Sequence, residues 1–223
     1  MRGRPVRVGV VTFPGSNGDR DMRDAVESID GLVAVPLWHA EEDLRACSAV
    51  ILPGGFSYGD RVRAGAIARS CRIMDGVQAF ARRGGPVLGV CNGFQILCES
   101  GLLPGLLGLN RDGRFRCATV PVRLEGRSTP FTEGAKPSLR LPIAHGTGRW
   151  HADLEVCRTV EGEGQVVMRY EEDINGSFGR IAGVCNAAGN VVGVMPHPER
   201  ACDPLLGSVD GRTFFETLLA RVA

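Results

Sequence analysis

The sequence has almost no lysine. Of its 26 basic residues only Lys136 is a lysine, and it lies in the polar, loop-like stretch EGAKPS. A phosphate-binding P-loop ends in Gly-Lys-Ser/Thr because the lysine side chain reaches the phosphates, and this motif is not present in the sequence. The scarcity of lysine therefore excludes most lysine-based chemistry and a nucleotide site of this type.

Long apolar runs and a strong excess of one charge are also missing. No window approaches the roughly 18 uninterrupted apolar residues that a membrane span needs. The net charge of +1 provides no broad basic field for nucleic acid or a membrane surface, although a local contact stays open. The N-terminal MRGRPVRVGVV has only a short apolar run, broken by Gly9, and no small-residue cleavage site, so we interpret it as a first strand. We expect a soluble, cytoplasmic protein.

The eight cysteines follow no metal-binding pattern. The sequence has no C-x-x-C and no Cys/His pair at the spacing of a zinc site. A disulfide framework is not expected in a chain of 223 residues without a secretion signal. We therefore expect no metal site and interpret most cysteines as small buried hydrophobic residues.

Strand-like and helix-like segments alternate in the first half of the chain. Apolar, β-branched runs predict strands at VRVGVVTF (6–13), LVAVPL (32–37), AVILPGG (49–55) and PVLGVC (86–91). Helical spacing of apolar residues predicts helices at RDMRDAVESI (20–29) and IARSCRIMDGVQAFARR (67–83). This alternation predicts an α/β protein with a mostly parallel central sheet flanked by helices.

The pattern changes from Cys117 onward. Short strands separated by Gly, Asn and Pro turns are predicted at ATVPVRL (118–124), LEVCRTV (154–160), QVVMRY (165–170), IAGVCN (181–186) and VVGVM (191–195). We expect them to form hairpins that extend or flank the sheet, and a last helix over TFFETLLARV (213–222). No repeat or long linker divides the chain, so we expect one domain over residues 1–223.

The stretch GVCNGFQ places Cys91 between a predicted strand and the helix-like GFQILCES. Sites in parallel sheets form at the carboxyl ends of strands, and G-x-C-x-G is a thiol version of the strand-turn-helix nucleophile elbow. Small flanking residues let the backbone turn and leave the sulfur exposed, while the next helix N-terminus favours a thiolate. From the local pattern alone, a catalytic cysteine and a buried structural cysteine are equally compatible with this position.

The stretch MPHPER follows another apolar run and contains a histidine and a carboxylate. His197 and Glu199 are two positions apart, so in a segment kept extended by the prolines they lie on the same side. A base oriented by a carboxylate is what a cysteine nucleophile requires. Alone, the pair is also compatible with a surface ion pair.

Two further loops follow or surround predicted strands. In ILPGGFSYGDRVRAG, Gly54 and Gly55 come directly after a strand, where their N–H groups could face a developing oxyanion. A phosphate cradle ranks lower, because the Lys-Ser/Thr ending and the G-x-G-x-x-G spacing are missing. In LPIAHGTGRW, His145 is either a second wall of the site or a satisfied turn histidine. His39 and His151 have no partner pattern and are interpreted as structural.

Together these stretches resemble the class I (triad) glutamine amidotransferases, and more narrowly the glutaminase subunits of phosphoribosylformylglycinamidine synthase of purine biosynthesis. The resemblance covers nearly the whole chain, through FPGSNGDRD (13–21), PGGFSYGDRVRAGAIA (53–68), GVCNGFQIL (89–97), PIAHGTGR (142–149) and MPHPERA (195–201). It implies a single glutamine amidotransferase domain with a flavodoxin-like core. One departure is Gly18, where many relatives are expected to carry a cysteine; this puts in doubt a role for a thiol in that loop.

The resemblance implies a role for each matching residue. Cys91 would be the nucleophile, His197 the general acid and base, and Glu199 the residue that orients it. Gly54 or Gly55, together with the N–H of Asn92, would form the oxyanion hole. Gln95 and the loop at His145 would line the glutamine pocket.

The resemblance also implies a partner. Ammonia released from glutamine would pass to a synthetase subunit that uses ATP and Mg²⁺ to convert formylglycinamide ribonucleotide into formylglycinamidine ribonucleotide, so this chain would need no cofactor of its own. A small third subunit is left open. The loop residues Tyr58, Asp60, Arg61 and Arg63 are predicted to contact the partner, with capping of the following helix as the alternative.

Two other classes of function are weighed against this one. A cysteine peptidase or deglycase of the same architecture is disfavoured by Gln95 and by the distant His-x-Glu segment. A non-catalytic binding subunit is disfavoured because Cys91, His197 and Glu199 are all present.

Overall fold

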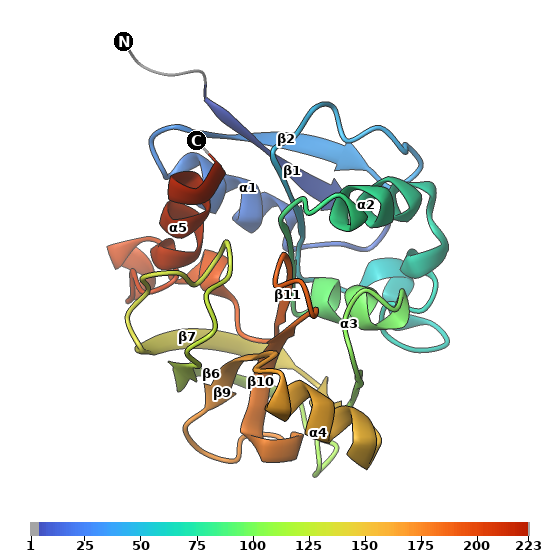
Figure 1. Cartoon of the computed structure of the whole chain (residues 1–223), viewed down its shortest axis with the longest axis vertical. Coiled ribbons are helices and arrows are strands. Elements are labelled where there is room, and N and C mark those ends of the chain that lie inside the picture. Colours follow the sequence, from blue (N-terminus) through green and yellow to red (C-terminus); the bar gives the residue numbers. More distant parts are fainter. Residues whose placement is uncertain (1–4, 223) are drawn as a thin grey trace.

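A nine-stranded mixed sheet forms the centre of the molecule in the computed structural model, which describes residues 5–222 (Figure 1). Its strand order is β2-β1-β3-β4-β11-β10-β9-β6-β7. The strands are β1 (Val6–Thr12), β2 (Leu32–Trp38), β3 (Ala49–Leu52), β4 (Val87–Val90), β6 (Arg116–Leu124), β7 (Ser138–His145), β9 (Val166–Tyr170), β10 (Ile181–Cys185) and β11 (Val191–Val194). A separate two-stranded sheet joins β5 (Leu106–Leu109) to β8 (Thr147–His151).

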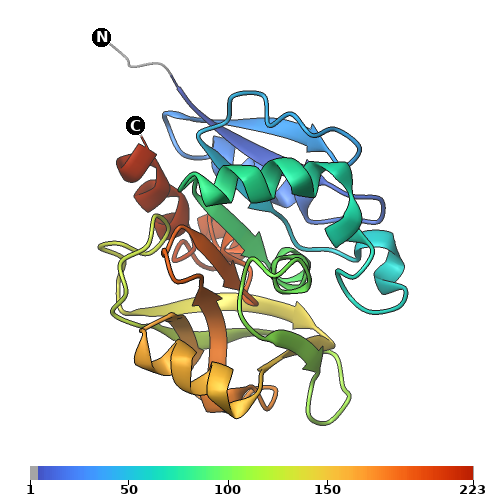
Figure 2. The same ribbon diagram turned by 45° about the vertical axis from the view of Figure 1, so that its right-hand side comes forward.

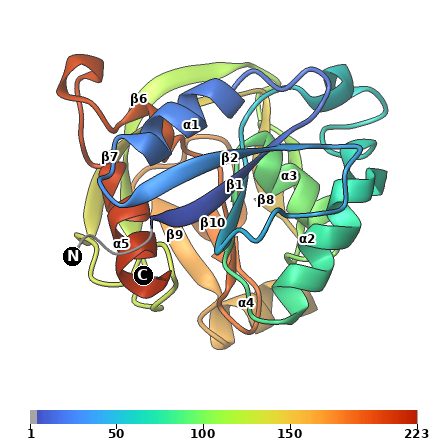
Figure 3. The same ribbon diagram turned by 90° about the horizontal axis from the view of Figure 1, so that it is seen from above.

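The parallel part of the sheet consists of β2, β1, β3, β4 and β11. Every residue of β3, β4 and β11 is buried, as expected for parallel strands that are covered on both faces. Seen from above, α1 (Asp19–Glu27) and α5 (Arg212–Val222) lie toward the left of the molecule, and α2 (Arg72–Arg82) and α3 (Asn92–Glu99) toward the right (Figure 3). The predicted α/β fold with a mostly parallel core is confirmed.

The helices begin and end for local reasons that the sequence shows. In α1, Met22, Ala25 and Val26 are buried at helical spacing. Two aspartates in its first turn interact favourably with the positive end of the helix dipole. The helix predicted over 67–83 is in two parts: a short 3₁₀ turn, Ala68–Ser70, and then α2. The break occurs at Cys71, whose backbone is extended.

The antiparallel strands β10, β9, β6 and β7 extend the sheet beyond β11. Such an extension was predicted for the second half of the chain, although β7 was not among the predicted strands. They lie in the lower half of the molecule, below the parallel strands (Figure 2). Within residues 5–222 no helix combines the length and the apolar character needed to cross a bilayer.

Two predictions from the second half are wrong. The stretch LEVCRTV is not a strand but part of a helix, α4 (Leu154–Gly162), in which Cys157 and Val160 are buried three residues apart and so share one face. The stretch LPIAHGTGRW is not a loop: its residues belong to β7 and β8. A short apolar run fits either period, and a strand with only alternate residues buried is easily taken for a loop.

The pairing of β4 with β11 brings distant parts of the chain together. The two strands are parallel and in register, with Val90 opposite Val194. The backbone N–H of Cys91 donates to the carbonyl of Val194 at 2.8 Å. Both strands therefore end at the same carboxyl edge of the sheet, where Cys91 follows β4 and His197 comes shortly after β11.

Candidate active site

Cys91 lies in a strained turn between β4 and α3. Its φ is +51° and its ψ is −105°, a conformation that costs a non-glycine residue about 1–3 kcal/mol. A Cβ on Gly93 would collide with the carbonyl oxygen of Leu52, and a Cβ on Gly89 would lie 2.7 Å from the backbone of Gly93. Both glycines of G-x-C-x-G are therefore required by close backbone packing, which fixes the cysteine at the start of the helix.

His197 and Glu199 are buried and bonded to each other. The imidazole Nδ1 lies 2.6 Å from Oε1 of Glu199, and the two residues are 1% and 3% exposed. Burial by itself would lower the pKa of His197, but the charges of Glu199 and Cys91 outweigh it and raise that pKa to about 10. His197 is therefore an imidazolium at neutral pH, held by a carboxylate and interacting with the sulfur.

The other ring nitrogen of His197, Nε2, is buried and has no hydrogen-bond partner among residues 5–222. Since Nδ1 is bound to Glu199, Nε2 is the nitrogen that can exchange a proton with a substrate. His197 lines the same pocket as Cys91. The residues predicted as a triad thus come together from two strand ends, although Cys91 and His197 are 106 positions apart in sequence.

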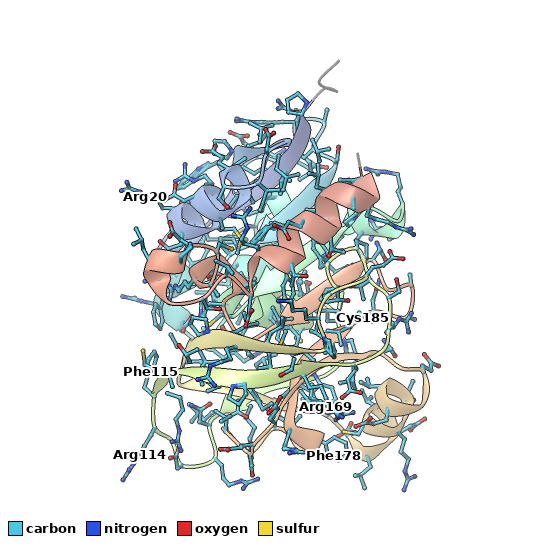
Figure 4. The ribbon with its side chains drawn as sticks, turned by 90° about the vertical axis from the view of Figure 1, so that its left-hand side faces the viewer. Arg20, Arg114, Phe115, Arg169, Phe178 and Cys185 are labelled. Carbon is cyan, nitrogen blue, oxygen red and sulfur yellow. The ribbon has the colours of Figure 1, made fainter. Side chains whose placement is uncertain are left out.

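The pocket at the triad has a volume of about 220 Å³. Its lining residues come from six segments of the chain, and they are Asn17, Gly55, Phe56, Asp60, Cys91, Gln95, Phe115, Ala144, His145, Gly146, Thr147, His197 and Arg200. Phe115 lies at the start of β6, at the margin of the molecule, and is 56% exposed (Figure 4). The pocket is large enough for a small polar molecule.

The two glycines predicted at the oxyanion hole have different positions. Gly55 lines the pocket, whereas Gly54 packs beneath the His197 ring and its carbonyl accepts a hydrogen bond from the N–H of Gly18. The Gly18 loop therefore supports this turn through its backbone. Asn92 begins α3, where backbone N–H groups have no partner within the helix. Gly55, which lines the pocket, and Asn92, at the first turn of α3, therefore remain the candidates for the oxyanion hole.

Asn92 and Gln95 form a buried hydrogen-bonded pair at the side of the pocket. Asn92 Nδ2 donates to Gln95 Oε1 at 2.8 Å, and Gln95 Nε2 donates to the carbonyl of Thr147 at 2.5 Å. The Asn92 side chain also accepts from the backbone N–H of Ser57 at 3.1 Å. These contacts connect α3 with β8 and with the loop after β3.

His145 forms a buried wall of the pocket. Its Nδ1 lies 3.0 Å from Asn110 Oδ1, and its Nε2 lies 3.5 Å from the hydroxyl of Tyr170. Burial, together with the positive charge of His197, lowers the pKa of His145 to about 4. His145 is therefore neutral near pH 7, and it lines the site while also being a satisfied structural histidine.

The four residues predicted to contact a partner do not form one outward surface. The Tyr58 hydroxyl points back into the protein, 3.0 Å from His39 Nδ1 and 3.1 Å from Cys71 Sγ. Arg63 makes two hydrogen bonds with Glu99, Arg61 is exposed, and Asp60 lines the pocket.

Sequence reasoning missed several residues of this site. Asn17 and Arg200 line the pocket and lie within matching stretches, but no role was predicted for either. Asn110 and Tyr170 hold His145 from elements 35 and 25 residues away. Arg200 could have been suspected, because it directly follows Glu199 in MPHPER.

Comparison with known proteins identifies the family. A profile of the CobB/CobQ-like glutamine amidotransferase domain matches residues 5–213. The PurQ subunit of phosphoribosylformylglycinamidine synthase from Rubrobacter xylanophilus is 58% identical over 217 residues, which cover 96% of this chain and 98% of that protein. The chain belongs to the PurQ family of glutamine amidotransferase subunits.

The PurQ fold is also found in solved structures. A chain in the structure of PurLQS from Thermotoga maritima is 43% identical, with a TM-score of 0.89 over 98% of this chain and 100% of that one. A glutamine amidotransferase from the same organism is only 18% identical, with a TM-score of 0.64 over 97% of this chain and 96% of that one, and it shows the fold alone. The resemblance stated from the sequence is confirmed.

Proposed function

We propose that this chain is the glutaminase subunit of phosphoribosylformylglycinamidine synthase and that it hydrolyses L-glutamine through a thioester on Cys91. The observation that carries the proposal is the buried His197–Glu199 pair, 2.6 Å apart, beside a strained elbow cysteine in one pocket. The names of the PurQ relatives supply the reaction that such a pocket would serve.

The first half-reaction releases ammonia. The Cys91 thiolate attacks the side-chain amide carbon of glutamine, and the carbonyl π electrons move to the oxygen. The N–H groups of Gly55 and Asn92 stabilise this oxyanion. His197 donates its Nε2 proton to the departing nitrogen, so the C–N bond breaks, ammonia leaves and a glutamyl thioester remains.

The second half-reaction restores the enzyme. Neutral His197 takes a proton from water, and the resulting hydroxide attacks the thioester carbon. The second oxyanion collapses, the C–S bond breaks, and the product leaves with Cys91 again a thiolate and His197 an imidazolium; its new γ-carboxyl group then loses its proton to solvent, which gives glutamate. Glu199 stabilises the imidazolium and fixes the orientation of the ring in both halves.

The ammonia is then used by a partner. The PurLQS name of the similar structure suggests assembly with two further kinds of subunit, and we propose a synthetase subunit and a small third subunit as partners. ATP and Mg²⁺ would act in the synthetase, which would aminate formylglycinamide ribonucleotide. The lack of a P-loop motif in this sequence supports that division of labour. We place the reaction in the cytoplasm.

A glutamate-release assay tests the proposal. The chain is assayed alone and together with a PurL/PurS pair, ATP and formylglycinamide ribonucleotide, with a Cys91→Ala chain as the control. Glutamate release that needs Cys91, coupled to amination of the ribonucleotide, is the expected result. Peptide or glycated-substrate hydrolysis without glutaminase activity would favour the rival hydrolase. Complex formation without any hydrolysis would favour a binding subunit.

A further inference from the structure

The free amino acid glutamine has a charged end that its pocket must recognise. Its side-chain amide goes to Cys91, while its α-carbon carries an ammonium and a carboxylate. We propose that the carboxylate of Asp60 binds the α-ammonium of L-glutamine and so makes the site specific for the free amino acid. This inference rests on the proposed glutaminase function and adds a specificity-determining residue to it.

The position of Asp60 fits this role. It lines the pocket that contains Cys91, and its Oδ1 lies 3.4 Å from Nδ2 of Asn92, the residue that follows the nucleophile. Three C–C bonds and one C–N bond separate the amide carbon of glutamine from its ammonium, an extended length of about 5 Å for bonds of about 1.5 Å. Because Cys91 and Asp60 line one small pocket, a glutamine whose amide meets Cys91 can bring its ammonium to Asp60.

Asp60 also has no cation of its own. Within residues 5–222 it takes part in no ion pair, and burial raises the pKa of its carboxyl. Two nearby cations are occupied, since Arg63 pairs with Glu99 and Arg200, which lines the same pocket, pairs with Asp21, while the neighbouring Arg61 is exposed. An unpaired, half-buried carboxylate gains most from a ligand that brings a positive charge.

The loop holds Asp60 toward the pocket by specific contacts. Tyr58 and Asp60 have positive φ values of 55° and 52°, which non-glycine residues rarely adopt. The Tyr58 hydroxyl is bonded to His39 and Cys71, and the backbone of Ser57 is bonded to Asn92. Surrounding structure therefore over-determines this turn, as expected where backbone strain aims a side chain.

The test compares two amides that differ in the ammonium alone. L-Glutamine is compared with glutaramate, which has the same side-chain amide and carboxylate but no α-ammonium, using the complete complex. We expect the wild type to prefer L-glutamine. We expect Asp60→Asn to lower kcat/KM for L-glutamine by about 10- to 100-fold, the usual loss for a hydrogen bond to a charged group, and to leave glutaramate hydrolysis unchanged. Asp60→Glu should recover part of the preference.

Three results would overturn the inference. In the first, Asp60→Asn lowers kcat/KM equally for both substrates, which would mean a structural role through Asn92. In the second, it lowers kcat/KM for neither substrate. In the third, the wild type hydrolyses the two amides with equal kcat/KM. Asp30→Asn, at an exposed position outside the pocket, is the matched control and should match the wild type. Glutamate release from L-glutamine by the wild-type complex is measured before any variant is compared. If the wild-type complex releases no glutamate at all, the proposed function fails.

Discussion

Replacing Gly54 by alanine tests the geometry of the triad without removing any of its members. A Cβ at this position would lie 2.7 Å from Cε1 and 3.3 Å from Nδ1 of His197, and 3.6 Å from the Cβ of Cys91. Gly54 is not in the left-handed region, so alanine meets no backbone penalty there and the effect is steric. The new methyl group pushes directly on the imidazole of His197.

The size of the effect follows from these distances. Carbon atoms in contact prefer about 3.5–4.0 Å, so the ring must retreat by about 1 Å. It has little room, because His197 is buried and its Nδ1 is bonded to Glu199. A misplacement of about 1 Å costs about 10²-fold in rate, and overpacking of this kind costs about 1–3 kcal/mol of stability. We expect Gly54→Ala to fold with a lower Tm and to lose about 10²-fold in kcat, with little change in KM.

The assay is glutamate release by the complex, with Tm measured on the same preparations. Gly162→Ala is the matched control, because nothing lies within 4 Å of the added Cβ, and Gly162 is the last residue of α4. Iodoacetamide alkylation of Cys91 shows whether the sulfur is still accessible. Equal kcat values for Gly54→Ala and Gly162→Ala would refute the reasoning, because the His197 ring would then have moved without consequence.

Four further predictions concern the triad and the partner. An electrophilic glutamine analogue should label Cys91 alone among the eight cysteines, as peptide mass spectrometry would show; labelling elsewhere would contradict the assignment. His197→Asn should lower glutaminase kcat by about 10²-fold or more and Glu199→Gln by less, since the imidazole remains; wild-type rates in both would exclude the triad. The pKa of His197 is raised from 6.5 to about 10, so its charged form stabilises the folded protein fully below pH 6.5, and this stability is lost as the pH rises through 10. Glu199→Gln removes a charge that raises this pKa. We therefore expect this variant to lose stability and activity at a lower alkaline pH than the wild type. Synthetase and acceptor should stimulate glutamate release steeply, and Arg63→Ala should weaken that stimulation more than the basal rate; equal rates with and without partner would show a preorganised site.

The sequence was sufficient to predict the parallel core and to place Cys91 and His197 at the ends of two of its strands, because both depend on local patterns. Buried β-branched runs predict strands, and parallel strands end at a common edge. Cys91 and His197 each follow such a run, so their convergence could be expected without knowing the sheet order. The β4–β11 pairing then brings them together.

The sequence was not sufficient where the decisive partner lies on another element. The apolar residues of α4 are too few to distinguish a helical from a strand-like spacing. In β7, by contrast, Leu139, Leu141 and Ile143 alternate as in a strand with one buried face, but this pattern was not used in the prediction. Whether His145 was a wall of the site or a satisfied turn histidine could not be decided, since Asn110 and Tyr170 reach it across the fold.

The orientation of the loop after β3 depends on backbone conformations that its sequence does not favour. Tyr58, Asp60 and Val62 all have positive φ, although none is a glycine and Val62 is β-branched. Such conformations persist only when tertiary contacts outweigh their cost, and here the hydrogen bonds of Tyr58 to His39 and Cys71 provide part of that compensation. Local propensity therefore predicts a flexible, outward loop. The folded core instead turns Asp60 into the pocket, a direction that the local sequence could not predict.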